Sequence, residues 1–125
     1  MRAITLDFDN EAKVNLSFFA GNYYEKVFHV TKGGVDYDWA NVTEIILQVK
    51  STTDSADKII ELKLSNADFV LTTGYMVMKL PTTKTDVEPG EYKSVELLII
   101  FSSTKPRTWW SGGVCKARKR AIILG

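Results

Sequence analysis

The chain contains one histidine, His29, and one cysteine, Cys115, two residue types that often serve as catalytic base and nucleophile. A Ser–His or Cys–His pair would have to be built around His29. This residue lies in KVFHV (26–30), whose alternation is typical of a β-strand, so we expect a packed or surface strand residue there. The counts also exclude a His-rich metal site, a structural zinc site and an internal disulfide.

Two pairs of acidic residues have the spacing that places both carboxylates on one face of a strand. They are Asp7 with Asp9 in LDFDN, and Asp36 with Asp38 in DYDW. Such oxygen ligands suit Ca²⁺, but neither stretch has the loop pattern of an EF-hand. Paired carboxylates also serve glycosidases, which need a cleft that this sequence does not indicate. We expect solvated strand faces at both places.

Two glycine-rich stretches, KGG (32–34) and SGG (111–113), are the remaining candidates for ligand chemistry. Neither has the spacing of a P-loop or a dinucleotide-binding turn, and neither precedes a predicted helix. Hairpin turns or bulges account for both. We therefore expect a chain without enzymatic activity, without a cofactor and without a metal.

The elements that position these residues are predicted to be β-strands of a single domain, residues 1–125. Turn signals recur at short intervals, and the runs between them are rich in Val, Ile, Phe, Tyr, Trp and Thr, which is typical of a sandwich or barrel. PTTKTDVEPG (81–90) predicts at most one short helical turn near 82–88. The clearest predicted strands are 26–30, 43–50, 58–64, 75–80 and 92–101.

No segment of the sequence predicts insertion into a membrane. The first ten residues, MRAITLDFDN, lack the apolar core of a signal peptide. The longest apolar run, LLIIF (97–101), is far shorter than a bilayer-spanning segment. We expect a soluble protein without a membrane partner.

Charge is distributed unevenly along the chain. Residues 1–96 hold all 15 acidic and 10 basic residues, a net charge of −5, whereas residues 97–125 hold six basic residues and no acidic one. Within this basic part, a strand would place Lys116, Arg118 and Arg120 on one face, opposite Cys115 and Ala117. We expect a protein interface or a solvated edge strand there, ahead of a nucleic-acid site.

Two pairs of adjacent aromatic residues bear on which side chains reach the surface. Trp109 and Trp110 are adjacent, as are Tyr23 and Tyr24, so in a regular strand each pair points to opposite faces. We expect one tryptophan to enter the core and the other to be exposed or covered by another chain. The competing interpretation is that both tryptophans are buried within the fold, and the sequence does not favour one interpretation over the other.

The order of these segments resembles a known family. It is similar to the small immunoglobulin-like domain of tailed-phage virion proteins, such as the N-terminal domain of siphophage baseplate upper proteins. The resemblance rests on FFAGNYYEKVFHV (18–30), DWANVTEIILQVK (38–50), KIIELKL (58–64), YMVMKLPTTKTDVEPGEY (75–92) and the final long strand pair (93–122). It implies an immunoglobulin-like antiparallel β-sandwich of about seven to nine strands. The basic last strand departs from the family pattern.

The resemblance implies a non-enzymatic structural or adaptor component of a virion, placed in the tail, baseplate, neck or head surface and assembled in the host cytoplasm. Its expected partners are other virion proteins and copies of itself, and neither a nucleic acid nor a small-molecule ligand is expected. The alternatives are a carbohydrate or host-surface binding module with an aromatic platform, and single-stranded nucleic-acid binding. The candidate interface residues are Tyr23, Tyr24, Trp109, Trp110, Lys116, Arg118 and Arg120.

Overall fold

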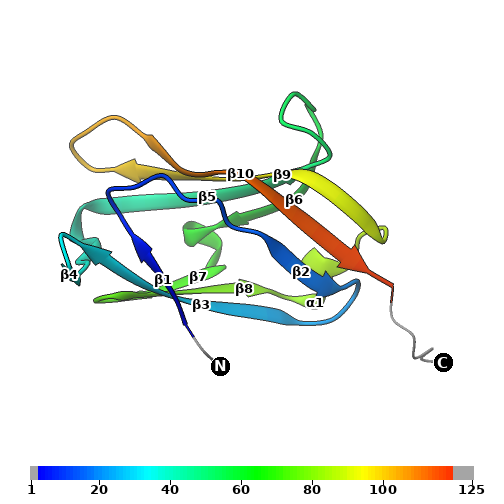
Figure 1. Ribbon diagram of the computed structural model, residues 1–125, viewed down its shortest axis with the longest axis horizontal. Coiled ribbons are helices and arrows are strands. Elements are labelled where there is room, and N and C mark those ends of the chain that lie inside the picture. The colour runs from blue at the N-terminus through cyan, green and yellow to red at the C-terminus, as the bar shows by residue number, and fades with distance from the viewer. Residues whose placement is uncertain (1–2, 120–125) are drawn as a thin grey trace.

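The computed structural model describes residues 3–119, which form two β-sheets packed face to face (Figure 1). The β3 sheet has the strand order β1-β3-β8-β7, with β4 paired to β3, and the β9 sheet has the order β2-β10-β9-β5-β6. The all-β sandwich expected from the sequence is confirmed. The strands are β1 (Ile4–Asp7), β2 (Leu16–Phe19), β3 (Tyr24–Lys32), β4 (Val35–Asp36), β5 (Val42–Lys50), β6 (Lys58–Lys63), β7 (Phe69–Thr72), β8 (Tyr75–Leu80), β9 (Gly90–Phe101) and β10 (Arg107–Arg118).

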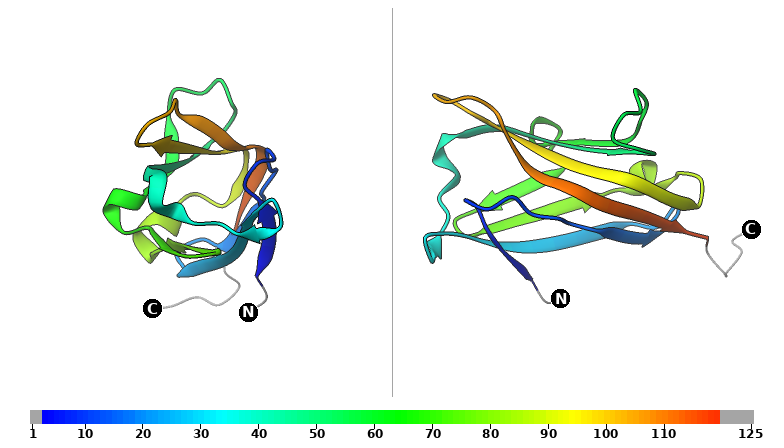
Figure 2. Two further views of the ribbon diagram at one scale, coloured as in Figure 1. Left: turned by 90° about the vertical axis from the view of Figure 1, so that its left-hand side faces the viewer. Right: turned by 45° about the horizontal axis from the view of Figure 1, so that its top comes forward.

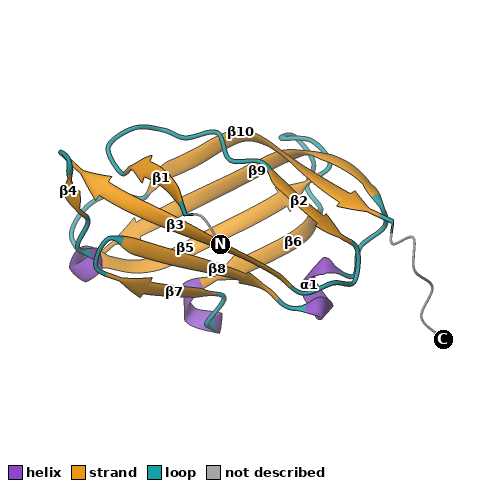
Figure 3. Ribbon diagram, turned by 60° about the horizontal axis from the view of Figure 1, so that its bottom comes forward, coloured by secondary structure: helices purple, strands orange, loops and turns teal. Residues whose placement is uncertain are grey.

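Helical structure within the described residues is limited to short segments at the margins of the sheets (Figure 3). The predicted helical turn near 82–88 is present as α1 (Thr82–Thr85), between β8 and β9. Two 3₁₀ turns, η1 (Trp39–Asn41) and η2 (Leu64–Asn66), precede β5 and follow β6. The Asp38 carboxylate caps η1 by accepting a hydrogen bond from the Ala40 amide at 3.1 Å.

The core lies between the two sheets and follows from the period of two in the strands. Ile45, Leu47 and Val49 of β5 are fully buried, and residues at alternate positions of the other long strands join them. The YMVMKL stretch of β8 buries Met76, Met78 and Leu80 completely. Each such side chain contributes about 1.5–3 kcal/mol when it is removed from water.

The order of strands is that of an immunoglobulin-like sandwich. β1, β3, β8 and β7 occupy the positions of strands A, B, E and D, and β10, β9, β5 and β6 those of G, F, C and C′. Two pairings depart from the expected antiparallel arrangement, because β1 runs parallel to β3 and β2 runs parallel to β10. The chain between them, residues 8–15, crosses from one sheet to the other, so each sheet receives one short N-terminal strand.

The connection between β8 and β9 contains a tyrosine corner, a feature of many immunoglobulin-like domains. The Tyr92 hydroxyl donates a hydrogen bond to the Glu88 carbonyl oxygen at 2.5 Å, just before β9 enters the core. Ser94 is buried two residues later, where antibody domains carry a disulfide cysteine. Cys115 is a free, buried thiol on β10, so the sandwich is held by packing and strand pairing.

β10 confirms one prediction and contradicts another. The SGG stretch, expected as a turn or bulge, lies inside this strand as a bulge, at register shifts against β9. β10 is not an edge strand, because it lies between β9 and β2, and an isolated bridge joins Ala12 to Trp110. The edge interpretation of the basic stretch is therefore wrong, since the N-terminal segment pairs with the side of β10 that faces away from β9.

Candidate functional site

The two adjacent tryptophans are both part of the core. Trp109 and Trp110 are each 0% exposed, so the expectation that one of them would reach the surface is wrong. The reason is a register shift between Thr108 and Trp110, which breaks the alternation and lets successive side chains turn inward. Trp109 donates its indole N–H to the Asn10 carbonyl at 3.1 Å, and Trp110 packs on Phe28 with ring centroids 4.9 Å apart.

The adjacent tyrosines behave as predicted, one inward and one outward. Tyr24 is half-buried beside Phe18, with ring centroids 5.7 Å apart, and burial raises the pKa of its hydroxyl. Tyr23 is 54% exposed, and its hydroxyl donates to the Glu25 carboxylate at 3.3 Å. Of the four aromatic residues proposed for the interface, Tyr23 alone presents most of its ring to solvent.

The cationic face of β10 is confirmed for the part of the strand that the structure describes. Lys116 and Arg118 are exposed, and Cys115 and Ala117 on the opposite face are buried. The third predicted cation, Arg120, lies outside the described residues. The Lys116 ammonium lies 3.9 Å from the Glu91 carboxylate on β9, and both groups are well exposed, so the attraction between them is weak.

Phe19 is a surface residue that is not among the interface residues predicted from the sequence. It ends β2 with 39% of its surface exposed, and the Arg118 guanidinium lies 4.3 Å from the centroid of its ring. The adjacent pair Phe18-Phe19 in a strand was the available signal, because Phe18 is buried and Phe19 must then point outward.

Backbone hydrogen bonds bring these residues to one end of the sandwich. The Ala20 amide donates to the Arg118 carbonyl at 2.8 Å, and the Asn22 amide donates to the Phe19 carbonyl at 3.0 Å. The end of β2, the end of β10 and the start of β3 therefore lie together, at the right of Figure 1. We name the exposed residues of this end, Phe19, Tyr23, Lys116 and Arg118, the β2–β10 surface. Within it Phe19 lies under Arg118, whereas the hydroxyl of Tyr23 contacts Glu25 of β3.

A shallow depression of about 480 Å³ adjoins this surface, over β2, β10 and β9. Lys13 and Lys116 line it together with the single carboxylate of Glu91, and Asn15 and Ser17 add neutral polar groups. An acidic or polar segment of another protein would therefore meet a net positive charge on the strand that also exposes the ring of Phe19. This combination is common at protein interfaces, where aromatic residues and arginine are enriched.

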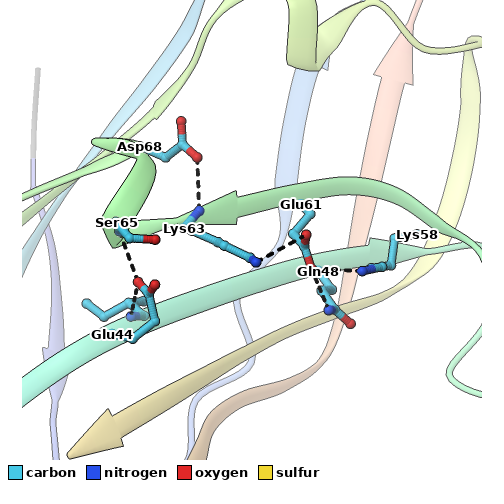
Figure 4. Close-up of polar contacts among 8 residues, drawn as sticks. Glu44, Gln48, Lys58, Glu61, Lys63, Ser65 and Asp68 are labelled. Atoms are coloured by element: carbon cyan, nitrogen blue, oxygen red, sulfur yellow. Dashed lines mark hydrogen bonds and ion pairs between the residues drawn. The ribbon is translucent and has the colours of Figure 1, made fainter.

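On the far half of the same sheet, charged side chains are paired with one another (Figure 4). The Glu61 carboxylate accepts a hydrogen bond from Gln48 at 2.8 Å and contacts Lys58 at 3.1 Å. These contacts lower the pKa of Glu61, the bond from Gln48 most of all. Asp68 accepts from the Lys63 amide at 2.9 Å and so closes the turn at η2. These groups hold β5, β6 and η2 together.

Cys115 and His29, the two residues considered as a nucleophile and its base, lie on different sheets. Cys115 is buried in the β9 sheet, and burial raises the pKa of its thiol to about 12. His29 lies on the β3 sheet instead, where its Nε2 atom is 2.8 Å from an Asp36 carboxylate oxygen and its ring stacks on Tyr75. A Cys–His pair is therefore not assembled.

The two acidic pairs have separate roles. Asp7 accepts a hydrogen bond from the Asp9 amide at 2.9 Å, and Asp9 pairs with Lys32 at 2.5 Å. Asp36 contacts His29, whereas Asp38 caps η1. Residues 3–119 contain no cluster of three or more His, Cys, Asp or Glu side chains arranged to hold a metal ion. Over the same residues, no helix has the length and apolarity needed to cross a bilayer.

No protein-family model matches the sequence, and no curated protein matches it either.

Proposed function

We propose that this protein is a non-enzymatic adaptor or structural component of a tailed-bacteriophage virion and that it docks on other proteins through the β2–β10 surface. The observation that carries the docking role is the exposed ring of Phe19 with the Arg118 guanidinium over it, on the face of β10 that also exposes Lys116, with the exposed Tyr23 in the turn that follows β2. The assignment to a virion rests on the resemblance of segment order described above.

The chemistry of this surface favours an acidic partner. Its cations are exposed and only Lys116 has an acidic neighbour, while the aromatic rings offer apolar area that a partner can cover. Charge complementarity would orient the partner, and burial of Phe19 and Tyr23 would supply most of the binding energy. Partners of this kind include another virion protein and the acidic first 96 residues of a second copy.

The aromatic platform for carbohydrate at this end of the molecule is not retained. It used Tyr23, Tyr24, Trp109 and Trp110, but both tryptophans are buried and Tyr24 is half-buried, so Tyr23 alone is left of the platform. Stacking of bases on these tryptophans, which single-strand nucleic-acid binding required, is excluded for the same reason. The β2–β10 surface thus favours a protein partner over either alternative.

The test is immunoblotting of virions purified from an infected host, followed by assembly complementation with variants. The wild-type protein is expected to co-purify with virions at a constant ratio to the capsid protein. The double variant Phe19→Ala/Tyr23→Ala should fold and lose most of its incorporation, whereas the control Tyr75→Ala, an exposed tyrosine on the other sheet, should be incorporated normally. Absence of the wild-type chain from virions contradicts the virion assignment, and normal incorporation of the double variant contradicts the docking surface.

A further inference from the structure

The opposite end of the sandwich carries a pocket that the proposed docking function does not use. Its volume is about 540 Å³, within the range of about 300–1,000 Å³ that is usual for small-molecule sites. It lies between the segment from β4 to η1 and the loop between β9 and β10. Figure 1 shows these two segments at its left. Loops at the end of a rigid sandwich are common places for ligand binding.

Aromatic rings form the apolar part of this end pocket. Tyr37 and Phe101 are half-buried and line it, so part of each ring is accessible. Tyr37 stacks on Phe8 with centroids 3.9 Å apart, and its edge meets Trp39 at 4.9 Å. The position of the Tyr37 ring is therefore held by two neighbours before any ligand arrives. A preformed ring of this kind suits a ligand with a flat apolar face.

Polar groups surround the same ring and retain free hydrogen-bonding capacity. The Arg107 guanidinium lies 5.2 Å from the centroid of the Phe8 ring, and within residues 3–119 it donates no side-chain hydrogen bond. Asn41 and Thr104 line the pocket, and their side chains make no hydrogen bond to another described residue. Asp38 uses one carboxylate oxygen for the η1 cap and keeps the other. Donors and acceptors are thus both available.

The charges of the pocket balance one another. Its lining has two basic side chains, Lys32 and Arg107, and two acidic ones, Asp36 and Asp38. Lys32 is already paired with Asp9, and Asp36 contacts His29. The Phe8 ring, which could attract a cationic ligand, already has Arg107 over it. A strongly charged ligand would therefore gain little here.

From these observations we infer that the end pocket binds a neutral carbohydrate. A sugar ring presents a C–H face that stacks on an aromatic ring, and hydroxyl groups that both donate and accept hydrogen bonds. Tyr37 supplies the stacking surface, Arg107 and Asn41 supply donors, and Asp38 supplies an acceptor. The site differs in residues and in location from the β2–β10 surface, so either can fail without the other.

The test uses the full chain in a glycan microarray and in ¹H–¹⁵N NMR titrations with lactose, maltose and cellobiose. At least one neutral sugar is expected to bind and to shift the backbone signals of Tyr37, Asp38, Asn41 and Thr104 together and saturably. The double variant Asn41→Ala/Thr104→Ala, which loses two hydrogen-bonding side chains, should bind that sugar about tenfold more weakly or worse. The control Asn66→Ala/Thr83→Ala removes the same side-chain types from exposed positions outside the pocket and should bind normally.

Three outcomes would overturn the inference. The first is the absence of binding to every neutral sugar on the array and in the titrations. The second is saturable shifting of the pocket signals by sulfate or tetramethylammonium but by no sugar, which would show that the pocket selects charge. The third is equal loss of sugar binding in the two double variants, which would place the sugar elsewhere.

Discussion

At the scale of single residues, Gly113 shows how closely the N-terminal segment approaches β10. A Cβ atom at position 113 would lie 2.0 Å from the Val14 carbonyl oxygen and 3.2 Å from the Val95 Cβ atom. The Asn15 side chain accepts a hydrogen bond from the Val114 amide at 2.9 Å, just beyond this contact. Only glycine permits the two backbones to pass here, so Gly113 lies in the predicted bulge and also allows the N-terminal segment to pack on β10.

The substitution Gly113→Ala is therefore expected to destabilise the protein by about 1–3 kcal/mol, as overpacking of a core usually does. Urea unfolding followed by circular dichroism measures this change in free energy. Gly90→Ala is the matched control, because a Cβ atom there meets nothing within 4 Å, and its effect should stay within about 0.5 kcal/mol. Equal stability of the two variants would contradict the close approach.

Cys115 provides a second prediction at this scale. Burial raises the pKa of its thiol from 9.0 to about 12, so at pH 8 the native protein holds roughly a thousandfold less thiolate than an ordinary cysteine. Iodoacetamide at pH 8 should label the native chain very slowly and the urea-unfolded chain readily, as mass spectrometry would show. Fast labelling of the native protein would mean that the thiol is accessible.

The same thiol makes stability depend on alkaline pH. Below pH 9 the thiol is protonated in the folded and in the unfolded protein, so its ionisation does not favour unfolding. Between pH 9 and about 12 the unfolded chain loses the proton while the folded chain keeps it, so the free energy of unfolding falls as pH rises. The variant Cys115→Ala should show a smaller fall over this range in urea titrations at successive pH values, and an identical fall in both proteins would contradict this origin.

At the scale of elements, the connection from β8 to β9 joins the two sheets and is stabilised locally. α1 ends at Thr85, whose hydroxyl donates to the Asn22 carbonyl at 2.6 Å, and Tyr92 then bonds back to Glu88. The sequence predicted the helical turn from its threonines and from Pro89-Gly90. It did not predict the tyrosine corner, because that bond requires the chain to turn back on itself before β9.

Tyr92→Phe removes this hydroxyl and keeps the ring, and it should lower the free energy of unfolding by about 1 kcal/mol. Differential scanning calorimetry with urea unfolding would detect the change. Tyr75→Phe serves as control, since the Tyr75 hydroxyl bonds to no residue in the described part of the chain and its ring stacking on His29 is retained. The corner has no stabilising role if both variants match the wild type.

At the scale of the whole molecule, the basic residues of β10 belong to two separate sites, one at each end of the strand. Its 12 residues, Arg107 to Arg118, extend about 35–40 Å and run along the sandwich (Figure 2). Arg107 lies at the end pocket, whereas Lys116 and Arg118 lie at the β2–β10 surface. Basic residues that lie close together in the sequence are therefore at opposite ends of the structure.

A single core predicts cooperative unfolding, and the tryptophans report on it. Trp39, Trp109 and Trp110 belong to one buried cluster, in which the centroid distances along this series are 6.4 and 5.7 Å. Tryptophan emission should therefore be blue-shifted in the native protein and should shift to the red at the same urea concentration at which the β signal in circular dichroism is lost. A fluorescence change at lower urea would show that this end opens separately.

The sequence by itself determined which side chains face inward in regular strands, because a period of two is a local property. In the predicted strand 43–50, Ile45, Leu47 and Val49 recur at every second position and are all buried, and Lys116 and Arg118 share an exposed face as predicted. The same local rule would have identified Phe19, once Phe18 was assigned to the core. The all-β class and the single helical turn likewise followed from local patterns and turn residues.

Only the tertiary structure decided that both tryptophans are buried and that β10 pairs with β2 as well as with β9. Both depend on contacts between residues about a hundred positions apart, such as that of Asn15 with Val114, and on register shifts against β9. Such pairing is set by the packing of whole strands, and a bulge reverses the local alternation on which sequence reasoning relies. For the same reason, the end pocket appears only when three separate loops meet at one end of the sandwich.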